Sequence, residues 1–276
     1  MLDNRPSVAI IIVTYNSMEE IGHCLESLVG HTEPFPTTIT VVDNASTDGT
    51  ADFVRKRWPD VQVIDAGDNL GFSRANNLGI RATRSDYVLL LNPDTLSPPG
   101  AIQTLVRGLA GHPDAAIGGA RMLNERGFPE LSWGPPLGPW NDFKQKLLSS
   151  LYHRKVRRYV RQVDRLSRQA REVAWVSGAC MVIRRPDLEA VGLLDERFFM
   201  YTEDVDLCMR MRQRGRTILY VAGAEVLHYR GRSAARNPAT ELKRRKSQVA
   251  YYDKHLPRWA GLFRLYLKVT RKPYAD

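Results

Sequence analysis

The sequence predicts an α/β fold in which a mostly parallel central sheet is flanked by helices. Three observations favour this fold: short apolar runs rich in β-branched residues recur along the chain, segments of helical length separate them, and the loops between them are short. With 276 residues, the chain can bury a sizeable core without staples, and its three cysteines are too few for a disulfide framework or a closed zinc site.

The first ninety or so residues carry the regular part of this pattern. The unalternating run at 7–13 is typical of a strand buried on both faces, and Ser17 with Glu20 resembles a capping box that opens the next helix. Further strands are predicted at residues 38–42, 61–64 and 87–91. Helices are predicted at residues 17–28, from the turn at 43–49 up to residue 57, and at 73–81.

The pattern changes after residue 126. Residues 127–140 contain four prolines and two tryptophans and predict an irregular loop, and the basic stretch 144–172 is expected to be helical. Strands are predicted at 173–184 and 217–221, a helix at 204–214, and helix from 240 onward with an interruption at Pro257. The expected organisation is a main domain at 1–239, with a basic insertion at about 127–172, and a helical C-terminal extension at 240–276.

The net charge of +10 indicates a polyanionic partner, so its location along the chain matters. Residues 1–143 carry 10 basic and 17 acidic side chains, residues 144–172 carry 10 and 2, and residues 241–276 carry 10 and 3. A nucleic-acid-binding protein is expected to place its basic face on the main fold, which here is acidic. Nucleic-acid binding is therefore a distant alternative, and no nucleic acid is expected as a partner.

The C-terminal extension has an apolar face with a basic flank. Residues 256–269 mix Trp, Leu, Phe and Tyr with Arg and Lys at helical spacing, as in interfacial membrane helices, but a helix packed on the core with a solvated charged side has the same pattern. No apolar run approaches the roughly 20 residues of a spanning helix, and the N-terminus has no apolar signal region. We expect a cytoplasmic protein, peripheral on the inner face of the cell membrane.

Polar residues follow three of the predicted strands. Thr14–Asn16, Asp43–Asp48 and Asn92–Asp94 all come at strand carboxyl ends, where the loops of an open α/β sheet form the ligand crevice. We therefore expect these three clusters to converge at one edge of the sheet.

Several acidic residues and one histidine are candidates for chemistry. Asp94 at a strand terminus suits Mg²⁺ or Mn²⁺, if substrate phosphates complete the coordination shell of the cation. An aspartate in a turn after proline has the same sequence pattern. Glu203 and Asp204 open a predicted helix. They either cap it, since the helix dipole favours acids there, or supply a general base in a shielded site. His228 follows a strand and precedes glycine and basic residues, as in a loop over phosphates, while a lone histidine is more often structural.

The segment from Asn69 to Gly79 places a glycine turn before a helix, with Arg74 in the first turn of that helix. Helix N-terminal amides and an arginine suit a phosphate. The segment matches neither the P-loop nor the dinucleotide fingerprint, which disfavours a kinase-like NTPase or a nicotinamide enzyme.

Taken in order, these pieces resemble the family-2 glycosyltransferases of the GT-A fold, and most of all the bacterial rhamnosyltransferase branch that builds cell-surface polysaccharides. The resemblance runs from about Val8 to His255. Its markers are the segments at 12–16, 42–49, 69–72, 91–94, 175–179 and 198–210.

The resemblance implies a role for each matching residue. The donor nucleotide-sugar would be held by Thr14, Tyr15, Asn16, Asp43, Asn44, Asn69, Gly71, Phe72, Arg74, Asn77, Asn92 and Asp94. The metal would be bound by Asp94 and His228. The catalytic pair would be Asp204, as the base, with Glu203, and the sugar and acceptor pockets would be shaped by Trp175, Gly178 and Ala179.

The implied reaction is an inverting, metal-dependent transfer of one sugar, favoured to be L-rhamnose from dTDP-rhamnose, to a glycan or a lipid-diphosphate-linked acceptor. A UDP-sugar-dependent transferase of the GlcNAc, galactose or galactofuranose type is the alternative. Asn92 stands where the family's acidic-x-acidic metal motif has its first acid, so one carboxylate is missing. The processive-synthase signature is absent, because Gln213-Arg-Gly-Arg216 lacks its tryptophan, and we therefore expect transfer of a single sugar.

Overall fold

A computed structural model of the chain describes residues 5–29, 34–154, 156–229 and 238–270. The strands are β1 (Val8–Thr14), β2 (Thr37–Asp43), β3 (Gln62–Asp65), β4 (Tyr87–Leu91), β5 (Thr95–Leu96), β6 (Ala115–Leu123), β7 (Trp133–Gly134), β8 (Arg171–Val173), β9 (Trp175–Val176), β10 (Cys180–Arg184) and β11 (Thr217–His228). The helices are α1 (Met18–Leu28), α2 (Thr50–Arg57), α3 (Gly71–Ala82), α4 (Ala101–Ala110), α5 (Pro139–His153), α6 (Arg157–Ser167), α7 (Arg185–Ala190), α8 (Glu203–Gln213), α9 (Pro238–His255) and α10 (Pro257–Val269).

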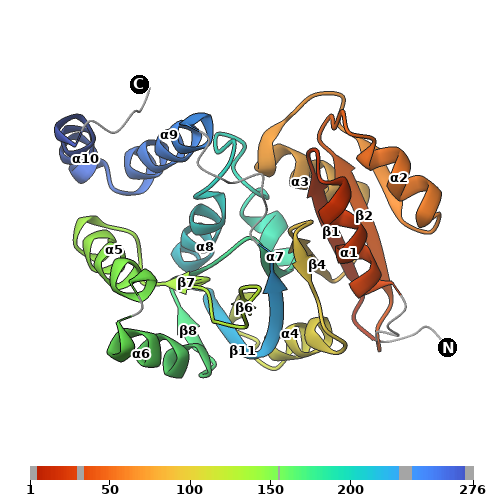
Figure 1. Cartoon of the computed structure of the whole chain (residues 1–276), viewed down its shortest axis with the longest axis horizontal. Coiled ribbons are helices and arrows are strands. Elements are labelled where there is room, and N and C mark those ends of the chain that lie inside the picture. The colour runs from red at the N-terminus through yellow and green to blue at the C-terminus, as the bar shows by residue number, and fades with distance from the viewer. Residues whose placement is uncertain (1–4, 30–33, 155, 230–237, 271–276) are drawn as a thin grey trace.

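A mixed sheet of order β3-β2-β1-β4-β10-β6-β11-β5 forms the centre, and β8 pairs with β11 on the side of that strand opposite β6 (Figure 1). The α/β class is confirmed. The parallel arrangement expected for most of the sheet holds for β3, β2, β1 and β4, while β10 runs antiparallel to both of its neighbours. The sequence pattern cannot show that β10 is reversed, because the direction of this strand depends on the path that the chain takes through the irregular segment after β6.

Both faces of the sheet are covered, so the strands are apolar on each side. In β1, Ile10 and Ile12 face a core that includes side chains of α1, α2 and α4, whereas Ile11 faces a second core that includes side chains of α3, α7 and α8. This alternation within an unbroken apolar run confirms that the strand is buried on both faces.

Several predicted boundaries need correction. The single strand expected at 173–184 is two strands, β9 and β10, separated by the turn Ser177–Ala179. The short strand expected at 217–221 continues to His228, because residues 222–224 form an irregularity after which pairing with β6 resumes. The capping box is also wrong: Ser17 makes no side-chain cap, and Asp48 Oδ2 instead accepts the Met18 amide at 3.2 Å.

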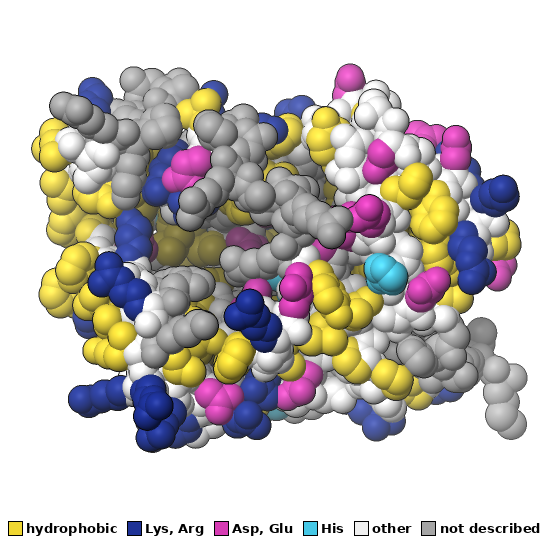
Figure 2. Space-filling model, viewed as in Figure 1, with side chains coloured by type: hydrophobic (Ala, Val, Ile, Leu, Met, Phe, Trp, Pro, Cys, Tyr) yellow, Lys and Arg dark blue, Asp and Glu magenta, His cyan; other side chains and the backbone are white. Residues whose placement is uncertain are grey.

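The basic insertion forms α5 and α6, and Figure 2 shows Lys and Arg side chains gathered over α6. The expected break at Pro257 is confirmed, since it separates α9 from α10. The division at 239/240 is still a prediction; it falls in the first turn of α9. Among the described residues, no helix is long and apolar enough to cross a membrane.

The fully buried carboxylate of Asp206 in α8 joins the C-terminal helices to the main fold. It accepts hydrogen bonds from Lys254 Nζ at 2.6 Å, His255 Nε2 at 2.7 Å and Arg210 Nε at 2.7 Å. Burial alone would raise the pKa of Asp206, but these three partners outweigh burial and lower it. A third core, with Phe198 from the main fold and Tyr252 from α9, completes the contact.

We predict that Asp206→Ala lowers the free energy of unfolding by about 3 kcal/mol, because it removes the fully buried carboxylate shared by Arg210, Lys254 and His255, of which Lys254 keeps its pair with Asp195. Urea unfolding at pH 7 measures this loss. Because the folded-state pKa lies below the unfolded value of about 3.9, the stabilisation is present above that pH and lost as the pH falls through the folded pKa. The control is Asp253→Ala, which removes a surface pair with Arg264 and is expected to cost less than about 1 kcal/mol. Equal losses in the two variants would contradict the role of Asp206.

Candidate active site

The carboxyl ends of β1 and β2 meet as predicted. Thr14 Oγ1 donates to Asp43 Oδ1 at 3.0 Å, and the Ser46 amide donates to Asp43 Oδ2 at 2.9 Å. Asn16 adopts a left-handed backbone (φ 51°), and its Oδ1 accepts the Thr47 amide at 2.8 Å. These bonds fix the loop that follows β2, and the neighbouring Tyr15 ring lies half exposed beside it.

Asn44 connects that loop to the start of α3. Its buried side chain donates from Nδ2 to Asn69 Oδ1 at 3.1 Å and accepts the Leu70 amide at 2.8 Å, while Asn69 Oδ1 also accepts the Gly71 amide at 3.1 Å. Two predicted donor-binding residues, Asn44 and Asn69, therefore bond to each other. Their amides orient the backbone at the N-terminus of α3.

The N-terminus of α3 lies against the loop that precedes α8. The Phe72 amide donates to the Phe199 carbonyl at 2.6 Å, and a Cβ on Gly71 would lie 2.4 Å from the same oxygen. Beside this contact is a cavity of about 670 Å³, whose lining includes Asn69, Arg74 and Phe199. Arg74 reaches Glu196 across the cavity at 3.6 Å. An anion in the cavity would meet Arg74 and the start of a helix, and it would compete with the lining carboxylates of Asp68 and Glu196 for the arginine.

Asn77, also predicted to bind the donor, is fully committed elsewhere. Its Nδ2 donates to the Leu194 carbonyl and to Glu196, and its Oδ1 accepts the Leu194 amide. With 1% of its surface exposed, Asn77 positions Glu196. A direct contact between Asn77 and a donor stays a prediction that this geometry does not favour.

Asp94 and His228 are adjacent, as the predicted metal pair requires. His228 Nε2 lies 3.3 Å from Asp94 Oδ1, and His228 Nδ1 lies 3.0 Å from Glu130 Oε2. Burial by itself would lower the pKa of His228, but the hydrogen bonds to both carboxylates raise it to about 9. Sequence reasoning missed Glu130, which lies 98 positions from His228 and carries no motif. The loop after His228, from residue 230, lies outside the described residues.

These donors fit a hard or borderline divalent cation with few protein ligands. Glu130 holds one ring nitrogen of His228, the arrangement that orients metal-binding histidines. A cation would bind Asp94 through an oxygen and would take the other ring nitrogen of His228 in place of its proton. Within the described ranges, no three His, Cys, Asp or Glu side chains converge on one metal position. A bound cation would thus need oxygen ligands from a substrate. Asn92, predicted to bind the donor, precedes Asp94 in the same turn.

The two acids that open α8 are in different environments. Asp204 Oδ2 accepts the Gly178 amide at 2.9 Å and Oδ1 accepts the amide of Val205 at 2.8 Å. Glu203 is buried, and its Oε2 has no hydrogen-bond partner among the described residues. Burial raises the pKa of Glu203 well above its ordinary value, with the charge of Asp204 adding to it, and burial also raises the pKa of Asp204. The amides of Gly178 and Val205 favour the ionised form of Asp204 and offset part of the effect of burial on its pKa.

The turn Ser177–Ala179 joins these acids to the metal pair. The Gly178 amide donates to Asp204. The carbonyl of the next residue, Ala179, accepts the amide of Asn92 at 2.9 Å, and Asn92 lies two residues before Asp94. The Phe72 ring lies within 3.6 Å of the position of a Cβ on Gly178. Trp175, just before the turn, donates from its indole to the Pro135 carbonyl at 2.9 Å. The turn therefore brings residues from α3, β4 and α8 to one place.

The α9 helix braces the loop that leads into α8. Ser247 Oγ donates to the Met200 carbonyl at 2.8 Å, and Lys243 Nζ lies 4.3 Å from the centre of the Phe199 ring. Neither contact was expected from the sequence, where residues 240–276 are read as a separate extension. The geometry makes α9 part of the wall behind Glu203 and Asp204.

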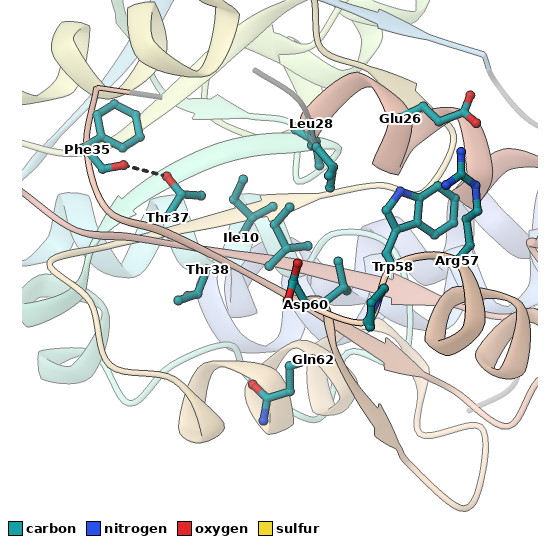
Figure 3. A pocket seen from close by; sticks show the side chains of 14 residues that line it. Ile10, Glu26, Leu28, Phe35, Thr37, Thr38, Arg57, Trp58, Asp60 and Gln62 are labelled. Carbon is teal, nitrogen blue, oxygen red and sulfur yellow. Dashed lines mark hydrogen bonds between the residues drawn. The ribbon is translucent and has the colours of Figure 1, made fainter. Parts of the chain in front are cut away.

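A second cavity, of about 720 Å³, lies at the opposite edge of the sheet. Figure 3 shows Ile10, Leu28 and Trp58 around it, at the amino ends of the strands and the ends of α1 and α2. None of the predicted site residues lines this cavity. Ligands of open α/β sheets bind at the carboxyl ends, so we place the active site at the first edge.

Comparisons with known proteins show the family of the chain and its fold. Residues 6–261 match the model of the family described as "Glycosyltransferase like family 2". The chain is 33% identical to the N-acetylglucosaminyl-diphospho-decaprenol L-rhamnosyltransferase of Mycobacterium tuberculosis, over 97% of this chain and 90% of the relative. It is 26% identical to the rhamnosyltransferase WbbL of Escherichia coli, over 80% of this chain and 83% of the relative.

Solved structures share the fold. A mannosyltransferase from Pyrobaculum calidifontis, in complex with GDP-Man and Mn²⁺, superposes with a TM-score of 0.64 at 20% identity, over 92% of this chain and 65% of that one. TarS 1–349 from S. aureus, in complex with UDP-GlcNAc, superposes with a TM-score of 0.59 at 17% identity, over 88% of this chain and 65% of that one. At these identities the likeness shows the GT-A fold, which confirms the predicted architecture.

We predict that Gly71→Ala destabilises the protein more than Gly67→Ala does. Both glycines have a positive φ, of 77° and 79°, so the backbone strain is matched. A Cβ at position 71 would also collide with Phe199, whereas nothing lies within 4 Å at position 67. We expect an additional loss of about 2 kcal/mol in urea unfolding. Equal losses would show that the approach of α3 to the Phe199 loop is not tight.

Proposed function

We propose a specific reaction for this chain, which belongs to the family-2 glycosyltransferases and is an enzyme of that class. The proposed reaction transfers a single L-rhamnose from dTDP-rhamnose to a lipid-diphosphate-linked glycan acceptor and inverts the configuration at the sugar carbon. The observation that carries the proposal is the Ser177–Ala179 turn, which holds Asp204 close to the Asp94 loop. The rhamnosyltransferase names of two relatives support the choice of sugar.

In this proposal the donor nucleotide lies along the carboxyl ends of β1 and β2. Asp43 faces the pyrimidine and Tyr15 offers an exposed ring beside it. The diphosphate extends toward Arg74 and the N-terminus of α3, where the guanidinium and the positive end of the helix dipole favour an anion that would compete with Glu196 for Arg74. A UDP-sugar remains the alternative donor, which the UDP-GlcNAc complex of the structural neighbour TarS supports.

A divalent cation, Mg²⁺ or Mn²⁺, would be held by Asp94 and His228, with the donor diphosphate completing its shell. It would stabilise the charge that develops on the departing diphosphate. The Mn²⁺ in a solved neighbour of the same fold supports this cofactor class. Asn92 leaves the site one carboxylate short of the family motif, and the role of Glu130 is to orient the His228 ring rather than to replace that ligand.

Asp204 acts as the general base. It takes the proton of the acceptor hydroxyl as the oxygen forms its bond to the sugar carbon and the bond from that carbon to the diphosphate oxygen breaks. Amides from Gly178 and Val205 orient the carboxylate, and the raised pKa brings it nearer to the working pH. Direct attack from the side opposite the leaving group inverts the configuration.

The acceptor is proposed to reach Asp204 from the side of the basic insertion. Trp175 is tied to Pro135 in that insertion, and residues 144–172 carry 10 basic side chains against 2 acidic. A diphosphate-linked acceptor brings negative charge to this region. The name of the mycobacterial relative, which includes a diphospho-decaprenol, supports this acceptor class.

We predict that Asp204→Asn lowers kcat at least about 100-fold while dTDP still raises the melting temperature by a similar amount. Turnover of dTDP-rhamnose and thermal shift with dTDP measure the two effects. Glu203→Gln, which mimics a protonated glutamic acid, is expected to lose less than about tenfold. The reverse pattern would move the base to Glu203, and full activity of Asp204→Asn would overturn the proposal.

We predict that Glu130→Gln weakens Mn²⁺ binding in the presence of dTDP about 10- to 100-fold, because the amide no longer fixes the His228 ring as a carboxylate does. Calorimetric titration of Mn²⁺ measures this without turnover. Glu125→Gln is the control, since Glu125 is exposed five residues away in the same segment. Equal Mn²⁺ affinity in both variants would contradict the assignment of His228 as a ligand oriented by Glu130.

A further inference from the structure

Helices α5 and α10 leave large apolar side chains in solvent. Figure 2 shows hydrophobic side chains along the edge of the molecule formed by these helices, with Lys and Arg between them. The apolar residues of this edge are Trp140, Phe143, Leu147, Trp259, Leu262, Leu265, Tyr266 and Val269, each between 37% and 74% exposed. We call these eight residues the apolar edge. Many of the other large exposed hydrophobic residues, such as Val29 and Phe128, belong to other elements.

The interpretation of the C-terminal helix as one packed on the core is confirmed for one side of α10, and the membrane interpretation stays a prediction for the other side. Ala260, Phe263 and Leu267 are buried against α9, and the Phe263 ring stacks on Tyr252 at 4.2 Å. The exposed apolar residues of α10 fall on one adjoining arc of about 120°, at 100° per residue. The packing of α10 therefore leaves a second apolar face, whose residues are 37% to 74% exposed among the described parts of the chain.

The α5 helix extends this face. Lys146 Nζ lies 5.0 Å from the centre of the Tyr266 ring in α10, and the Tyr252 hydroxyl donates to Asp142 Oδ2 at 2.7 Å. Trp140, Phe143 and Leu147 follow one another at the i, i+3, i+7 spacing of a single helix face. The Lys146–Tyr266 contact thus places α5 beside α10, and the Tyr252–Asp142 hydrogen bond ties α5 to α9.

The charges around the apolar edge select its partner. Lys144 and Lys146 on α5 and Arg258 and Lys268 on α10 are exposed beside it, and the segments that contain them are strongly basic. In a contact between two copies of this chain, these cations would face each other. An anionic bilayer would neutralise them, and the Trp and Tyr rings suit the interface between headgroups and acyl chains.

We propose that the apolar edge of α5 and α10 is a membrane-docking surface that inserts into the interface of an anionic bilayer. This proposal deepens the proposed function, because α5 belongs to the insertion that we place on the acceptor side. It rests on the proposed function for the identity of the acceptor. Leu137, two residues before α5, packs in the core shared by α9 and α10. Docking would hold the active site next to a lipid-linked substrate.

The test is co-sedimentation of the full chain with vesicles of phosphatidylglycerol and phosphatidylcholine, or of phosphatidylcholine alone. The double variant Phe143→Ser/Leu262→Ser removes one exposed apolar side chain from each helix. We expect wild type to bind the anionic vesicles at least about tenfold better than the neutral ones, and the double variant to lose at least about tenfold. Each single variant is expected to lose part of that affinity.

The control is Val29→Ser/Phe128→Ser, which removes two side chains of similar exposure outside the edge. Loss of binding in the control to the same extent, or no loss in the double variant, would overturn the proposal. A loss of binding confined to Leu262→Ser would also overturn the proposal, since α5 would then take no part. The same holds if the wild type is a dimer without lipid and the double variant is a monomer. Turnover of a water-soluble acceptor analogue tests the proposed function separately: its absence with binding intact would reject the function and leave the surface standing.

Discussion

The hydrogen bond from the Gly178 amide to Asp204 is the contact on which the site depends most. It fixes the carboxylate that opens α8 against a turn, and the next residue of that turn, Ala179, accepts the amide of Asn92. The acids at the start of α8 and the Asp94–His228 pair are therefore parts of one bonded assembly. In the proposed mechanism, this assembly would let the base and the site for the leaving group act on the same sugar carbon without large rearrangement.

The support behind this assembly comes from the end of the chain. Asp206 is buried in α8 and bonded to Lys254 and His255 of α9, and α9 also contacts the loop at Phe199 and Met200. The C-terminal helices therefore have two roles in the account: one face stabilises the catalytic helix, and the other face of α10 is left for docking. In this account, the basic side chains lie outside the acidic main fold because they flank the docking face and not the catalytic site.

The sequence predicted the elements whose signals are local. The unalternating strand β1, the helices α1 and α3 and the break at Pro257 all follow from periodicity and from proline. The role of Glu130 could not be predicted, because it depends on a contact with His228 that only the folded sheet creates. The same holds for the turn Ser177–Ala179, where an apolar run that reads as one strand is interrupted by bonds to Asp204 and Asn92. Tertiary contacts, not propensity, decide these positions.

The central claim is a direct displacement in which Asp204 deprotonates the acceptor hydroxyl. The configuration of the transferred sugar tests this claim most directly, because one displacement inverts the anomeric carbon and two displacements restore it. The one-bond carbon–proton coupling at C1 of the product, measured by NMR and compared with that of the dTDP-rhamnose donor, reports this configuration. The account predicts a product with the opposite anomeric configuration, and a product that retains the configuration of the donor would contradict it.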